Sequence, residues 1–215
     1  MRFIEQLGVA QIQQGSRIAL GIVPHPPTMP AALARYDDPF FPYGKAVIEA
    51  TRDHVCAYVV HLSAYLAHGG AGAVALERTL AYVPAPLLRI LHAPFATGEY
   101  VRAAFEDSFG AHAVTIAAGT PVEDIRPYLA EEQHGVFLHA ADRDHISALA
   151  EAFPGQVGVY HGVGRTAYEC ELVGTFPTLK FHWTWGDPVF PPRPAGEDYA
   201  AGWRNALRDL ARRVK

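Results

Sequence analysis

The sequence predicts a single α/β domain over residues 1–215 that folds as a closed (β/α)₈ TIM-type barrel. Short apolar runs alternate with longer segments of helical period, and this alternation continues to the end of the chain. Each run is apolar on both faces, as in a parallel sheet that helices cover. Such alternation favours a barrel, while an open doubly wound sheet stays an alternative because periodicity does not distinguish the two.

The individual elements are predicted from apolar runs and from turn and capping signals. Strands are expected at residues 17–23, 54–60, 87–91, 113–117, 135–138, 156–160 and 178–181, with an irregular eighth at 188–193. Helices are expected near 100–109, 121–129, 146–153 and 199–210. The second of these starts at Thr120-Pro121-Val122-Glu123, which has the form of a capping box. Residues 24–43 hold six prolines and are expected to cross the barrel mouth, as a stiff surface loop or as a lid.

The composition restricts the class of protein. Apolar residues make up 50% of the chain and charged residues 19%, which is typical of a folded globule. A net charge of −4 gives no electrostatic reason to expect a nucleic acid or an anionic membrane as partner. No run approaches the length of a membrane span, so we expect a cytoplasmic protein. Cys56 and Cys170, the first in a strand-like and the second in a helical run, are expected to be buried thiols.

Histidines follow most of the predicted strands. Five stand at the strand ends, and His25 follows the first strand; the five are His61, His92, His139, His161 and His182. Barrel enzymes place their catalytic groups at the carboxyl ends of strands, so these imidazoles are predicted to point to one end of the barrel. The remaining five are expected at the surface: His54, His68, His112, His134 and His145.

Neutral imidazole is a common ligand of transition metals. The sequence therefore predicts that the five strand-end histidines hold a divalent ion, either zinc, iron or manganese. Within this set His61, His92 and His161 are the candidate catalytic groups. The candidate substrate-binding residues are His25, Tyr160, Lys180, Trp183 and Arg193.

Several segments in order resemble orotidine 5′-phosphate decarboxylase of the bacterial type. They include Ile18-Ala-Leu-Gly-Ile-Val-Pro-His25, Lys45-Ala-Val-Ile-Glu-Ala-Thr51, Gly69-Gly-Ala-Gly-Ala-Val-Ala-Leu-Glu-Arg-Thr79 and Gly135-Val-Phe-Leu-His-Ala-Ala141. The resemblance covers roughly residues 3 to 185. It implies a ribulose-phosphate-binding type of barrel, a small-molecule substrate and a homodimer.

The chain departs from this family at its charged motif. The family carries Asp-x-Lys-x-x-Asp after the third strand, where this chain has His92-Ala-Pro-Phe-Ala-Thr97. Val23 stands at the family's first-strand aspartate, and His61 near its second-strand lysine. Residues 181–186 replace the glycine-rich phosphate loop, and Arg193 is the candidate for the phosphate-binding arginine. The resemblance therefore implies a divergent member that does not decarboxylate orotidine monophosphate, because the family's array of fixed acids and lysines is absent.

Three functions remain open from the sequence. The first is a metal-dependent lyase, hydrolase or isomerase acting on a small polar or phosphorylated molecule. The second is a non-catalytic homologue that binds a ligand as a sensor. The third is metal-free acid–base catalysis by the histidines, including decarboxylation of another substrate.

Overall fold

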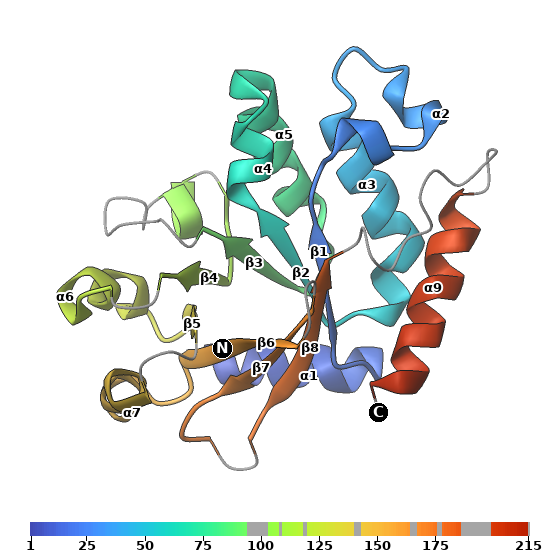
Figure 1. The fold of residues 1–215 in the computed structure, drawn as a ribbon. Coiled ribbons are helices and arrows are strands. Elements are labelled where there is room, and N and C mark those ends of the chain that lie inside the picture. The colour runs from blue at the N-terminus through green and yellow to red at the C-terminus, as the bar shows by residue number, and fades with distance from the viewer. Residues whose placement is uncertain are drawn as a thin grey trace.

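Eight strands close into a barrel in this computed structural model, which describes residues 1–93, 103–107, 109–117, 120–139, 143–163, 167–175, 178–185 and 199–214. The strands follow one another around the barrel in chain order (Figure 1). They are β1 (Ile18–Ile22), β2 (Ala57–His61), β3 (Leu88–His92), β4 (Ala113–Ile116), β5 (Gly135–His139), β6 (Val157–Val163), β7 (Ala167–Leu172) and β8 (Lys180–Trp185). The predicted closed barrel is confirmed.

The direction of one strand departs from the regular pattern. Neighbours from β1 to β6 are parallel, and β8 is parallel to β1. In contrast, β7 is antiparallel to both β6 and β8. Only residues 164–166 separate β6 from β7, and residues 173–179 separate β7 from β8. Connections this short form hairpins, because a parallel crossover needs a dozen or more residues.

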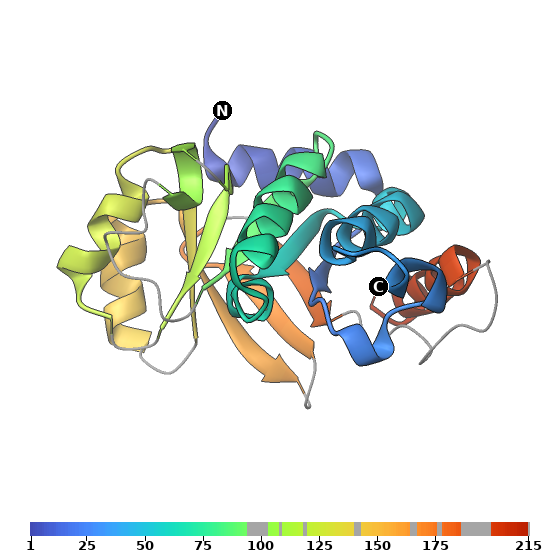
Figure 2. The ribbon, with the colours of Figure 1, turned by 90° about the horizontal axis from the view of Figure 1, so that it is seen from above.

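Helices surround the strands. They are α1 (Phe3–Gln14), η1 (Pro26–Thr28), α2 (Ala31–Ala34), α3 (Phe40–Thr51), η2 (Arg52–His54), α4 (Leu62–Leu66), α5 (Gly69–Tyr82), the π-helical turn η4 (Ala103–Asp107), α6 (Val122–Ile125), η5 (Arg126–Leu129), α7 (Arg143–Ala152) and α9 (Tyr199–Arg213). α3 lies between α5 and α9, and contacts both (Figures 1 and 2). None of the helices in the described ranges is long and apolar enough to cross a membrane.

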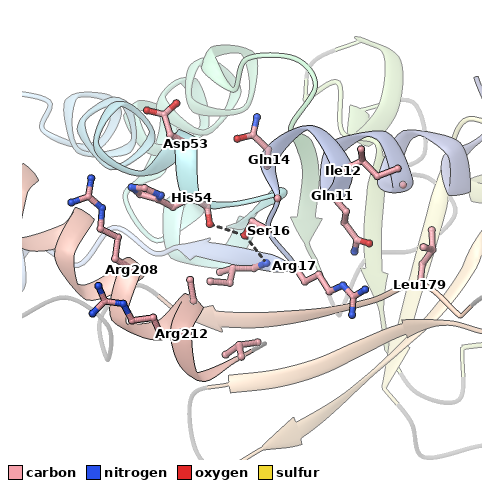
Figure 3. A pocket seen from close by; sticks show the side chains of 15 residues that line it. Gln11, Ile12, Gln14, Ser16, Arg17, Asp53, His54, Leu179, Arg208 and Arg212 are labelled. Atoms are coloured by element: carbon pink, nitrogen blue, oxygen red, sulfur yellow. Dashed lines mark hydrogen bonds between the residues drawn. The ribbon is translucent and has the colours of Figure 1, made fainter.

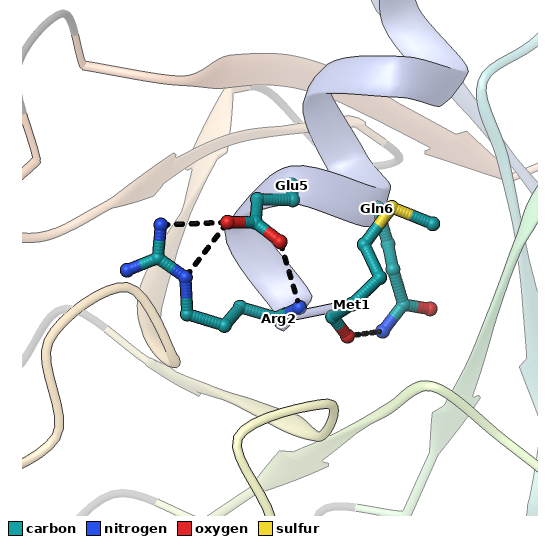
Figure 4. Close-up of polar contacts among 4 residues, drawn as sticks. All are labelled: Met1, Arg2, Glu5 and Gln6. Carbon is teal, nitrogen blue, oxygen red and sulfur yellow. Dashed lines mark hydrogen bonds and ion pairs between the residues drawn. The ribbon is translucent and has the colours of Figure 1, made fainter.

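The first helix closes the barrel at the amino-terminal ends of the strands. Phe3 and Leu7 of α1 are fully buried among side chains that point into the barrel, and the Phe3 ring lies 6.0 Å from that of Phe137. The backbone N–H and the guanidinium of Arg2 both donate to the Glu5 carboxylate, at 3.1 and 2.8 Å (Figure 4). This capping box fixes the first turn, so that the apolar side chains of α1 plug one end and leave the other for a site.

The structure corrects the last two predicted strands. The segment predicted as the seventh strand, 178–181, begins β8, and β7 was not predicted. Cys170, predicted on a helical run, lies in β7, and both it and Cys56 are buried as predicted. The predicted eighth strand at 188–193 lies outside the described residues. Side chains of β7 and β8 alternate between the barrel interior and the outer face, which is the two-residue period of a β-strand.

The structure also corrects two local predictions. The capping box at Thr120 does not form: the Thr120 hydroxyl donates to the Ala117 carbonyl at 2.8 Å, and α6 starts without a side-chain cap. Residues 24–43 are not one continuous loop, because they form η1, α2 and the start of α3. Met29 and Leu33 of this segment are buried in the outer core. Whether the segment acts as a lid stays a prediction.

Candidate functional site

Two of the predicted histidines lie side by side at the carboxyl ends of neighbouring strands. His61 ends β2 and His92 ends β3, and the two residues are register partners in the sheet. Their imidazole rings are 4.8 Å apart and meet nearly edge to face. Both follow side chains two residues earlier, Val59 and Ile90, that point into the barrel, so the imidazoles cover the top of the barrel core.

Hydrogen bonds orient both imidazoles. The Ala64 backbone N–H donates to Nδ1 of His61 at 3.3 Å, so the neutral ring carries its proton on Nε2. Nδ1 of His92 lies 2.8 Å from the Thr115 hydroxyl oxygen, which accepts from the Ala93 N–H at 3.1 Å. This second bond favours the Thr115 hydroxyl as the donor to His92. Each ring then presents an Nε2 N–H that no described group uses.

Three aromatic side chains surround this pair. The ring of His92 lies 5.0 Å from Trp183, 5.3 Å from Trp185 and 6.4 Å from Tyr160. Trp185 also lies 5.2 Å from His61. These five residues are called the aromatic–imidazole cluster below. Trp183 is 2% exposed, and its indole N–H has no hydrogen-bond acceptor among the described residues. A buried donor without a partner is costly, which makes this N–H a candidate contact for a ligand oxygen.

Burial keeps the two imidazoles neutral. Burial, with a smaller contribution from the like charge of the neighbouring His61, lowers the pKa of His92 to about 3. Burial also lowers the pKa of His61, against a backbone hydrogen bond that raises it. At neutral pH the pair therefore offers two N–H donors and no net charge.

The other predicted site residues on β5 and β6 differ in whether they belong to the cluster. Tyr160 belongs to the aromatic–imidazole cluster, and burial raises the pKa of its phenol to about 12. His139 is exposed, with its ring 5.4 Å from that of Tyr160. His161 is exposed on the outer face, because its neighbour Tyr160 points inward and successive side chains of a strand alternate.

His182 also points away from the barrel interior. It stands between Phe181 and Trp183, which both belong to the interior core, so its ring lies on the outer face of β8. There its Nδ1 lies 2.9 Å from the Glu169 carboxylate on β7. The prediction that five imidazoles converge at one end is therefore wrong for His161 and His182. Both belong to the polar outer face of the β6–β7–β8 hairpins.

The remaining substrate-binding candidates are not part of the aromatic–imidazole cluster. His25 is exposed and lies beside Thr28, with 3.4 Å between its Nδ1 and the hydroxyl. Lys180 starts β8 at the opposite end of the barrel and pairs with Glu171 at 3.1 Å. Arg193 lies outside the described residues. Trp185 and Thr115 complete the site instead; a threonine inside the apolar run 113–117 was the available signal for the latter.

The predicted metal centre is wrong. Within the described ranges, no three His, Cys, Asp or Glu side chains are placed to hold an ion. The physical reason is strand alternation, which leaves only His61 and His92 adjacent and turns two other imidazoles outward. The proposed zinc, iron or manganese cofactor is therefore withdrawn.

None of the five histidines that were expected at the surface is fully exposed: His134 is buried, and the other four are half-buried, namely His54, His68, His112 and His145. His134 is 8% exposed, and its ring stacks on Phe105 at 3.9 Å. His112 accepts a hydrogen bond from the Arg89 backbone N–H at 3.0 Å. Burial, together with the Arg89 guanidinium, lowers the pKa of His112 to about 4. His112 and His134 lie near the starts of strands, at the end of the barrel that α1 closes.

The fold and the imidazole pair together define a TIM-type barrel with a candidate site at the carboxyl ends of its strands. No family model matches the chain. The chain is 35% identical to an orotidine 5′-phosphate decarboxylase of Roseiflexus castenholzii over 143 residues, which are 64% of this chain and 52% of that protein. It is 33% identical to one of Thermomicrobium roseum, over 64% of this chain and 50% of that protein. The resemblance to the orotidine 5′-phosphate decarboxylase family is therefore confirmed.

Solved structures support the same fold. The chain matches Leishmania donovani OMP decarboxylase with a TM-score of 0.66 and 17% identity, over 100% of this chain and 97% of that one. It matches Leishmania donovani UMP synthase with a TM-score of 0.58 and 22% identity, over 74% and 39% of the two chains. By sequence, the chain spans about half the length of the curated relatives it matches. The relatives give no support to the expectation that the chain is a metal-dependent enzyme other than a decarboxylase.

Proposed function

We propose that the chain is a decarboxylating enzyme that binds a planar, negatively charged substrate at the aromatic–imidazole cluster without a metal ion. The observation that carries this proposal is the pair of adjacent, neutral imidazoles of His61 and His92, each with an unused Nε2 N–H. The names of the relatives supply the reaction class. The homodimer, the single domain and the cytoplasmic location stay predictions.

The cluster suits such a substrate in two ways. The partly exposed ring of Trp185 provides apolar contact for a planar ring, and the buried Trp183 N–H offers a donor to a ring oxygen. The imidazole N–H groups bind a carboxylate. A carboxylate within hydrogen-bond distance of both imidazoles raises the pKa of each, because it stabilises their charged form.

The reaction then needs only groups of the chain. Substrate binding brings a proton from water onto His92, and the hydroxide ion that this leaves passes to solvent. The C–COO⁻ bond breaks, its electron pair stays on the ring carbon, and CO₂ leaves. The carbanion takes the proton from the imidazolium, which returns to the neutral state. The Nε2 N–H of His61 stays hydrogen-bonded to the carboxylate until CO₂ departs.

The test is release of CO₂ from orotidine monophosphate by protein treated with a chelator. We expect turnover in the wild type, which replaces the expectation, drawn from the absent Asp-x-Lys-x-x-Asp array, that the chain does not act on this substrate. His92→Ala is expected to lose about 100-fold or more, because a general acid contributes at least that much. Trp183→Phe, which keeps the ring and removes the N–H, is expected to raise KM more than it lowers kcat. His161→Ala on the outer face is the control and is expected to retain activity.

A second candidate is a binding protein without turnover. The neutral state of His92, with a pKa of about 3, favours it, because the free protein holds no proton there to deliver. In this case uridine or orotidine monophosphate quenches the fluorescence of Trp183 and Trp185, and no CO₂ is released. Absence of both binding and turnover would contradict both candidates.

A further inference from the structure

A cavity lies at the amino-terminal end of the barrel, opposite the aromatic–imidazole cluster. Its volume is about 760 Å³, within the range of small-molecule sites. The end of α1, the start of β1, η2 and the last turns of α9 line it, together with Leu179 before β8. Figure 3 shows Arg208 and Arg212 extending from α9 on one side, and Arg17 and Gln11 on the other.

The charge of this cavity is opposite to that of the chain. Arg17, Arg208 and Arg212 line it against one acidic residue, Asp53, although the whole chain carries −4. Arg212 pairs with Asp209 at 3.3 Å, and both side chains are exposed. No carboxylate of the described residues is paired with Arg17 or Arg208. Two guanidinium groups are therefore available for an anion, and Arg is the side chain best suited to bind phosphate or carboxylate in a bidentate manner.

The pKa of His54 shows the effect of the positive charges around the cavity. Its pKa is lowered first by burial and then by the charge of Arg208, with Arg204 adding to the effect and Asp53 opposing it. Its backbone carbonyl accepts from the Ser16 hydroxyl at 2.7 Å, and this hydroxyl oxygen accepts from the Ile18 N–H at 3.2 Å (Figure 3). These bonds hold the wall between α1 and β1 in place.

The rest of the lining is apolar. Ile12, Leu179, Ala211 and Val214 all face the cavity. Ile12 is 83% exposed, so its side chain is open to contact with a bound molecule. A simple inorganic ion would leave this apolar wall in contact with water, whereas a molecule with an apolar body would cover it.

We propose that this cavity binds a small amphiphilic anion, a phosphate or carboxylate attached to an apolar ring or short chain. The anionic group contacts Arg208 beside His54, and the apolar body lies toward Ile12 and Leu179 on the other side of the cavity. This site is independent of the proposed decarboxylase function, since it shares no residue with the aromatic–imidazole cluster.

The experiment uses phenyl phosphate and benzoate as probes, with benzyl alcohol as the uncharged reference, and measures binding by calorimetry. We expect the wild type to bind one or both anions and not the alcohol. The double variant Arg17→Gln/Arg208→Gln is expected to bind at least about tenfold more weakly, because a charge-assisted hydrogen bond contributes on that scale. The NMR titration of His54 gives a second readout: the bound anion raises its pKa.

Two controls separate this site from its alternatives. Arg213→Gln removes the same charge from the last turn of α9 but does not line the cavity, so binding is expected to be unchanged. If Arg208 and Arg212 only stabilise the carboxyl end of α9, the double variant loses thermal stability and wild-type protein binds neither anion, which overturns the proposal. His92→Ala is expected to retain binding; loss of binding there would place the probes at the other end of the barrel and also overturn it.

Discussion

Lowering the pH from 7 to 5 is expected to reduce the free energy of unfolding by several kcal/mol. His92 has a folded-state pKa of about 3 and His112 one of about 4, whereas both titrate near 6.5 in the unfolded chain. Above pH 6.5 both imidazoles are mostly neutral in the folded and in the unfolded chain, so they take nothing from the free energy of unfolding. Below it the unfolded chain takes up protons that the folded chain refuses, so stability is lost as the pH falls toward the folded-state values. At pH 5 each buried histidine accounts for about 2 kcal/mol.

Urea unfolding at pH 7, 6 and 5 measures this effect, and most carboxylates stay ionised over that range. His92→Asn and His112→Asn are expected to be less stable at pH 7 but to show a smaller loss between pH 7 and pH 5. His161→Asn, which removes an exposed imidazole, is expected to keep the wild-type pH dependence. A wild-type unfolding midpoint that does not change between pH 7 and pH 5 would contradict the buried, neutral state of His92 and His112.

The barrel itself could be predicted from the sequence because its first six strands are apolar on both faces. Hydrophobic runs of this kind require helices on the outside and a filled interior, and the fold follows. β7 and β8 have a different pattern, in which Glu169, Glu171 and His182 alternate with apolar neighbours. This alternation of polar and apolar side chains is the signal for a hairpin, whereas the expected order of elements there was strand–helix–strand.

The candidate site was predicted in part for the same reason. His61 and His92 end two parallel strands, and the buried core fixes which side chains of these strands point inward. That the two imidazoles lie close together therefore follows from their positions at the strand ends. His161 and His182 also follow apolar runs, but each is one residue out of phase with the inward side chains of its strand. A shift of one residue moves a side chain to the other face. The bond from Thr115 to His92 joins two strands and depends on their register, which the sequence does not supply.

A close contact between α4 and α5 fixes the segment that follows β2. A methyl group added to Gly72 of α5 would fall on the backbone carbonyl of Tyr65 in α4. Tyr65 is fully buried, and its hydroxyl donates to the Thr79 hydroxyl oxygen at 3.2 Å. Thr79 lies about two turns beyond Gly72 along α5. Tyr65 is thus held at both its backbone and its ring, and the carbonyl cannot move away without disturbing the buried hydrogen bond.

Gly72→Ala is therefore expected to destabilise the protein by about 3 kcal/mol, although alanine is the better helix former. For a chain of this length the melting temperature falls by about 6–12 °C. Gly70→Ala is the matched control in the same helix: nothing lies within 4 Å of its added carbon, so it is expected to be neutral or to stabilise by up to about 1 kcal/mol. Calorimetric melting of the two variants beside the wild type measures the difference. Equal melting temperatures for Gly72→Ala and Gly70→Ala would mean that α4 and α5 do not pack this closely, and the position of His61 at the start of α4 would then need another support.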